Sequence, residues 1–204
     1  MEWKCLKSWT GRTFSLSVPS VAHPLPRFLT VSLARELGIL LALSLMFPFL
    51  IHVLPVPETS RLGVRLLPMF YAPLLAALWG RVTTAWLVAL IAPWLNWALT
   101  RHPTPSGGIM LTIQLLVFVL VVRLLLSRAG VRWFMAVPAY LAGLGAALVA
   151  ASVFPALIGG RPPVDWAVQS VMRSLPGVGV LVLITCLVLR FYPPSGKGGG
   201  PATA

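Results

Sequence analysis

Residues 65–126 read RLLPMFYAPLLAALWGRVTTAWLVALIAPWLNWALTRHPTPSGGIMLTIQLLVFVLVVRLLL. The stretch holds apolar runs at about 66–79, 82–99 and 109–126, separated by a short basic turn at Gly80 and Arg81 and a polar loop. Each run is close to the roughly 20 apolar residues that a membrane-crossing helix needs. The first run is short and contains prolines, so we expect it to be kinked or only partly inserted.

The composition of the whole chain supports a membrane protein. Of 204 residues, 58% are hydrophobic and only 10% are charged, whereas a soluble domain has about 25% charged residues. The net charge is +12, from 16 basic and 4 acidic residues. The basic residues sit mostly between apolar runs, which points to membrane lipid and topology rather than to nucleic acid.

Further apolar runs cover about 29–54, 134–158 and 166–192, so the sequence predicts an all-α, polytopic bundle of six transmembrane helices over residues 28–192. Residues 1–27 are expected to form a basic cytoplasmic tail without the apolar core of a signal peptide. Residues 193–204 form a low-complexity, flexible C-terminal tail.

Charge counting predicts that both ends lie inside. With the N-terminus inside, the inner segments hold eleven basic residues and the outer loops hold four. The positive-inside rule therefore favours an N-in, C-in protein of a plasma membrane. The predicted outer loops carry Glu58, Arg65, Arg101, His102, Arg161 and Asp165.

Small residues recur every four positions in two spans. Ala34, Gly38 and Ala42 form one such face in the first span, and it suits either internal packing or docking of a partner helix. Gly143 and Ala147 belong to a similar face in the fifth span. For that face we predict an intramolecular helix contact.

Two amides lie near the predicted outer ends of neighbouring spans, Asn96 in the third and Gln114 in the fourth. An amide is costly in hydrocarbon without a hydrogen bond, so both side chains should face the bundle interior. Either residue alone fits an interhelical hydrogen bond equally well. Their position near the same face favours a binding site.

Trp166, Gln169 and Arg173 share one face of the sixth span, by their i, i+3, i+7 spacing. An arginine within a membrane span is a functional candidate by default. The alternatives are that Arg173 snorkels to the outer interface or pairs with Asp165. We prefer a role in binding.

Tryptophans near span ends usually form an interfacial belt. Trp94 and Trp97 also fit a sharper interpretation, as stacking walls for a planar ligand. His102 has no second histidine or carboxylate at ligand spacing, so we predict neither a metal site nor a cofactor.

Catalytic and proton-relay patterns are missing from the sequence. It contains no GxSxG, HExxH or P-loop motif and no acidic pair. No convergent nucleophile and base can be assembled from Ser44, Ser152 or His52. We therefore expect a membrane subunit that binds a ligand without being an enzyme.

The central stretch resembles the substrate-binding S component of energy-coupling factor (ECF) transporters, small bacterial proteins that capture vitamins and related micronutrients. The likeness lies in LLPMFYAPLLAALWG, in the span ending LIAPWLNWALT, in RHPTP and in MLTIQLLVF. Gln114 stands in place of a glutamate found in family members, and Phe70 stands where many relatives have histidine.

The resemblance implies a fold, a partner and a site. In the family, a small-residue face on the first helix docks on a transmembrane T component driven by two ATPase subunits, and Ala34, Gly38 and Ala42 match that face. The ligand sits under the outer loops. With the arginines suiting carboxylate or phosphate groups, the expected binding residues are Arg65, Asn96, Arg101, Gln114, Gln169 and Arg173, with Trp94 and Trp97 as walls.

We therefore expect a substrate-capture subunit of an ECF-type importer that takes up a small vitamin-like or anionic micronutrient. The alternative is a structural or assembly subunit of a membrane complex with no ligand of its own. The two differ in geometry, because an assembly subunit would have outer loops packed shut over apolar residues.

Overall fold

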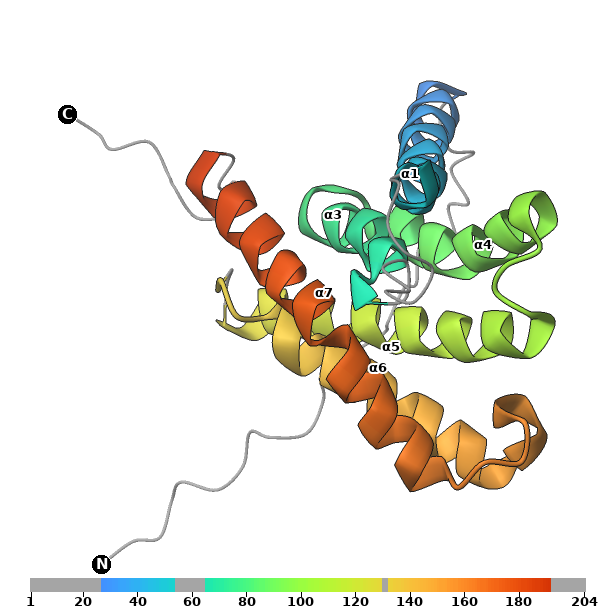
Figure 1. Cartoon of the computed structure of the whole chain (residues 1–204). Helices are drawn as coiled ribbons and strands as arrows, with labels where there is room; N and C mark the ends of the chain where they lie inside the picture. Colours follow the sequence, from blue (N-terminus) through green and yellow to red (C-terminus); the bar gives the residue numbers. More distant parts are fainter. Residues whose placement is uncertain (1–26, 54–64, 130–131, 192–204) are drawn as a thin grey trace, which may run out of the picture.

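The computed structural model describes residues 27–53, 65–129 and 132–191. The predicted tails lie outside these residues, apart from Arg27 at the start of the first helix, and so does the loop that holds Glu58 and Arg61. Within the described residues every regular element is a helix (Figure 1). The predicted all-α class is confirmed.

In the part of the chain that the structure describes, five helices are long and apolar enough to cross a membrane. They are α1 (Arg27–Val53), α4 (Val82–Thr100), α5 (Pro105–Ala129), α6 (Ala136–Val153) and α7 (Pro163–Phe191). A shorter apolar segment consists of η2 (Pro68–Phe70) followed by α3 (Tyr71–Trp79), and η3 (Pro155–Ile158) follows α6. These elements are those of a helical membrane bundle, while the count of six spans and the N-in, C-in orientation remain predictions.

Prolines explain where the helices begin and end. Pro105 and Pro163 each occupy the first position of a long helix, where a missing N–H costs nothing. Both helices therefore begin a few residues before the predicted spans. Pro155 cannot continue α6, so the predicted fifth span divides into α6 and the separate turn η3.

The short helix α3 forms the centre of the core. It packs against α1, α4 and α5, and most of its residues are buried. Phe70, just before α3, is 1% exposed, and its ring meets Phe118 of α5 and Tyr140 of α6 edge-on at centroid distances of 5.2 and 5.5 Å. Edge-to-face pairs at this spacing add to the apolar burial. Phe70 therefore joins α3 to α5 and α6.

Helices α5 and α6 approach each other through small residues. Gly143, Ala147 and Ala151 are buried, and the Gly143 backbone lies against the backbone of Gln114. The predicted intramolecular contact of this face is confirmed.

Helix α1 lies at the periphery, against η2, α3 and α4 (Figure 1). Ala34, Gly38 and Ala42 are exposed, and Gly38 has no atom within 4 Å of where a Cβ would be. The interpretation of this face as internal packing therefore does not hold among the described residues. Ile39, 54% exposed, lies beside it.

A polar cluster holds the turn between α3 and α4 to the helices around it. Glu36 of α1 accepts a hydrogen bond of 3.1 Å from the backbone N–H of Arg81, whose guanidinium donates to Ser32 at 2.9 Å. The Arg123 guanidinium of α5 donates to the carbonyl of Gly80. The buried part of Arg123 thus gives a partner to a carbonyl at the C-terminal end of α3.

Candidate functional site

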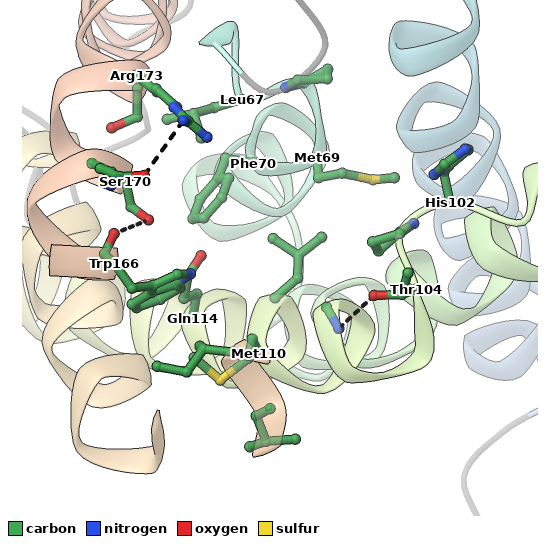
Figure 2. A pocket seen from close by; sticks show the side chains of 18 of the residues that line it. Leu67, Met69, Phe70, His102, Thr104, Met110, Gln114, Trp166, Ser170 and Arg173 are labelled. Atoms are coloured by element: carbon green, nitrogen blue, oxygen red, sulfur yellow. Dashed lines mark hydrogen bonds between the residues drawn. The ribbon is translucent and has the colours of Figure 1, made fainter. Parts of the chain in front are cut away.

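A cavity of about 870 Å³ is lined mainly by residues from the end of α4, the loops after α4 and α6, and the first halves of α5 and α7. Figure 2 shows side chains of its lining. Four groups of residues form its walls. They are Leu67–Phe70 before α3, Asn96 with the loop His102–Thr104, Met110 to Gln114 on α5, and Trp166 to Ser174 on α7. Pro48, Gly107, Tyr140, Leu157, Ile158 and Arg161 complete the lining.

Four of the sequence-predicted binding residues line this cavity: Asn96, Gln114, Gln169 and Arg173. They come from three helices, α4, α5 and α7. The structure therefore brings together residues that lie up to 77 positions apart in the chain.

Asn96 has a structural role at the cavity wall. It is 6% exposed, and its Nδ2 donates to the backbone carbonyl of His102 at 2.8 Å. The Thr100 hydroxyl donates to the Asn96 carbonyl at 2.8 Å and lies 3.1 Å from the same His102 carbonyl. Asn96 thus holds the loop that forms one side of the cavity, rather than bonding another helix.

Gln114 reaches the cavity from α5. Its side chain is half-buried and points into the cavity, as does Trp166 (Figure 2). The position of its backbone is set by Gly143, which allows α6 to pass close by. An amide placed in this way can both donate and accept hydrogen bonds.

Helix α7 carries a ladder of polar side chains along the cavity. Ser170 donates to the carbonyl of Trp166 at 2.8 Å, and the Arg173 Nη2 donates to the Gln169 Oε1 at 3.4 Å. One turn deeper, the buried Tyr140 hydroxyl of α6 donates to the Ser174 Oγ at 2.7 Å. The predicted shared face of α7 is therefore the face that lines the cavity.

The part of the cavity wall just before α3 contains a residue in the left-handed conformation. Leu67 has φ 52°, a conformation that a bulky side chain adopts only when its surroundings hold it there. The Tyr71 hydroxyl donates to the Leu66 carbonyl, and Gly177 of α7 lies directly against residues 65–67. Pro176, next to Gly177, interrupts the hydrogen-bond pattern within α7 at the same level.

The charge of the lining is positive. Arg161 and Arg173 contribute guanidinium groups, and the described lining residues include no aspartate or glutamate. Asp165 is exposed in the first turn of α7 and is not one of the lining residues. Arg173 donates to Gln169, so the alternative of a pair with Asp165 does not hold among the described residues.

The other predicted binding residues lie outside the lining. Trp94 and Trp97 stack edge-on against each other at 6.5 Å, and the Arg101 guanidinium lies 5.7 Å from the Trp97 ring. Arg101 has φ 60° and donates its backbone N–H to the Trp97 carbonyl at 2.8 Å, which caps the end of α4. Arg65 is exposed beside the Leu67 turn.

Sequence reasoning missed several lining residues. Met69, Met110 and Tyr140 appear in the sequence as ordinary apolar core residues, and nothing in their spacing separates them from the core. The loop residues His102 and Thr104 could have been found, because the RHPTP loop follows Asn96 directly.

Metal binding finds no support in the donor set. The described residues contain no group of three or more histidine, cysteine, aspartate or glutamate side chains that could hold a metal ion. The cavity offers amide, hydroxyl, imidazole and guanidinium groups instead. This set suits hydrogen bonding to a polar or anionic organic molecule.

Comparison of the chain with protein-family models, curated proteins and solved structures finds no match. Function is therefore inferred from the geometry of the chain itself.

Proposed function

We propose that this protein captures a small, anionic, vitamin-like molecule from outside the cell and passes it to an ECF-type importer as its S component. The observation that carries the proposal is the cavity of about 870 Å³ with two arginines and no described acidic residue in its lining. Ligand pockets of small molecules fall in the range of about 300–1,000 Å³.

The polar groups of the cavity support capture rather than packing. Gln114, Gln169 and Arg173 approach one space from two helices. A mostly apolar pocket with a few convergent polar groups is the usual form of a small-molecule site. Arginine recognises carboxylates and phosphates through paired N–H donors.

The orientation of the chain links the cavity to uptake. With the N-terminus inside, the ends of α4 and α6 and the starts of α5 and α7 face outward, and most of the residues that line the cavity come from this region. The turn at Arg81 and the end of α5 at Arg128 then face the cytoplasm, where positive charge is favoured.

The exposed face of α1 supports the partner part of the proposal. Ala34, Gly38 and Ala42 are exposed on one side of a peripheral helix. A T component, driven by two ATPase subunits, would pack its own helix against this face because small residues let backbones approach closely.

A structural or assembly subunit is the second candidate, and the exposed face of α1 also fits it. Such a subunit needs no opening among its loops. The cavity and its polar lining weigh against it.

Native mass spectrometry of the purified full chain tests the proposal. We expect a co-purified or added small molecule bound at one copy per chain, with Arg173→Ala and Asn96→Ala each weakening the complex. Arg101→Ala is the matched control, because Arg101 lies outside the lining. Unchanged occupancy in both cavity variants would refute the site.

A further inference from the structure

The cavity has different chemistry at its two ends, and helix α7 spans the difference. Trp166, Gln169, Ser170 and Arg173 all line it. Trp166, Ser170 and Arg173 follow one face of the helix (Figure 2). With a rise of 1.5 Å per residue, seven residues place the backbones of Trp166 and Arg173 about 10 Å apart along the helix axis.

The end near Trp166 has an apolar wall. Trp166 packs against a buried cluster of Met110, Ala147, Ala151 and Ile158, in which Met110 is 4% exposed. An indole ring beside a polarizable thioether gives a surface that suits a planar or apolar group. Hydrogen-bonding groups at this end are the Gln114 amide, which also points into the cavity, and the guanidinium of Arg161, in the loop just before α7.

The end near Arg173 is cationic. A guanidinium has five N–H donors, and the bond to Gln169 uses one of them. Ser170 lies one position beyond Gln169 and presents a hydroxyl on the same face. A carboxylate or phosphate oxygen bound here would meet a fork of donors without a competing described acid in the lining.

The size of the cavity favours a ligand larger than an inorganic anion. The cavity, at about 870 Å³, has the volume of roughly thirty water molecules. An inorganic anion would reach the Arg173 end and leave the Trp166 end filled with water. A ligand that contacts both ends must extend over about 10 Å.

We infer that the ligand is an amphipathic organic anion, bound with its acidic group at Arg173 and Gln169 and its planar or apolar body against Trp166 and Met110. This inference rests on the proposed capture function and adds the ligand class and its direction in the site. Arg173 recognises the acidic group of the ligand, and Trp166 recognises its planar or apolar part.

Calorimetric titration of the full chain in detergent tests the inference with three probes that share one ring system. Naphthylacetic acid and naphthyl phosphate distinguish a carboxylate from a phosphate ligand, and naphthylacetamide is the neutral counterpart. We expect at least one acid to bind about tenfold or more tightly than the amide, the range of one charge-assisted hydrogen bond. Millimolar inorganic phosphate should not displace it.

Two variants separate the two ends of the site. Arg173→Gln should weaken the acid about tenfold or more and leave the amide unchanged. Trp166→Leu should weaken acid and amide by the same factor. Arg101→Gln, which removes the same charge outside the cavity, should bind both probes as the unmodified chain does.

Equal binding of acid and amide, an equal effect of Arg173→Gln on both, or displacement by inorganic phosphate would overturn the inference. If no probe binds, the chemical class of the co-purified molecule tests the inference. An organic acid lost in Arg173→Gln supports the inference, and a neutral or cationic molecule overturns it while leaving capture intact. If no probe binds and no molecule co-purifies, both proposals fail.

Discussion

A Cβ on Gly143 of α6 would lie 2.6 Å from the backbone carbonyl oxygen of Gln114 in α5. No side chain fits at that distance, so the glycine is what allows the two helices to meet. The same contact sets where Gln114 enters the cavity. The contact between Gly143 and Gln114 therefore determines both the packing of α5 against α6 and the place of the Gln114 side chain in the cavity.

Gly143→Ala should destabilise the protein by about 1–3 kcal/mol, because the added methyl group overpacks a tight backbone contact. It should also weaken ligand binding by displacing Gln114. Gly145→Ala is the control on the same helix, since nothing lies within 4 Å of its Cβ position. Thermal unfolding in detergent compares the two, and equal melting temperatures would show that the helices can separate without cost.

Arg123→Gln should destabilise the protein by about 1–3 kcal/mol, because it removes the donor to the Gly80 carbonyl at a partly buried position. Arg128→Gln removes the same charge from an exposed position on the same helix and should change stability little. Chemical denaturation of both variants is the measurement. A similar loss in both would assign the effect to net charge rather than to the hydrogen bond.

Asn96→Asp keeps the size of the side chain and removes the N–H that the His102 carbonyl accepts. We expect faster hydrogen exchange in peptides that cover residues 100–108, with little change in the helices around them. Asn96→Leu should give the same result, because it also lacks the donor. Protected loop amides in both variants would mean that Thr100 alone holds the loop.

Tyr140→Phe and Ser174→Ala should each cost about 1 kcal/mol, the usual net contribution of one hydrogen bond. The two side chains share a buried bond of 2.7 Å, so the double variant should lose less stability than the two single losses added together. A double-mutant cycle on unfolding free energies measures this coupling. Strict additivity would exclude the bond as a stabilising contact.

Thr104→Cys should react with a membrane-impermeant maleimide in intact cells, and Ser127→Cys should react only after the membrane is opened. Both positions are exposed, at opposite ends of α5, and neither change alters the charge that sets topology. The background replaces Cys5 and Cys186 with serine. The reverse labelling pattern would place the N-terminus outside and the cavity on the cytoplasmic face.

The long apolar runs predicted the helices well, because a run of that length has few other stable forms in lipid. Local backbone events were not predictable from hydropathy. The left-handed turn at Leu67 depends on Tyr71 and on Gly177 of a distant helix. The break after Val153 was marked by Pro155, but the run of apolar residues across it concealed the signal.

Polar residues that are rare in apolar spans were a good guide to the residues that line the cavity. Asn96, Gln114 and Arg173 are unusual in apolar spans, and all three line the cavity. Trp94, Trp97 and Arg101 lie near the C-terminal end of α4, close to Asn96. Their side chains contact one another and do not line the cavity. Spacing along one helix cannot decide between these outcomes, because the partner that captures a side chain comes from another segment.

Pro176 has a mechanical consequence for α7. Without its N–H, the Met172 carbonyl loses the donor that a regular helix would supply, so α7 is least stiff at this point. The turns before it line the cavity, and buried residues such as Leu181 and Thr185 lie after it. A bend of α7 at Pro176 would therefore move the turns that line the cavity relative to the buried second half of the helix.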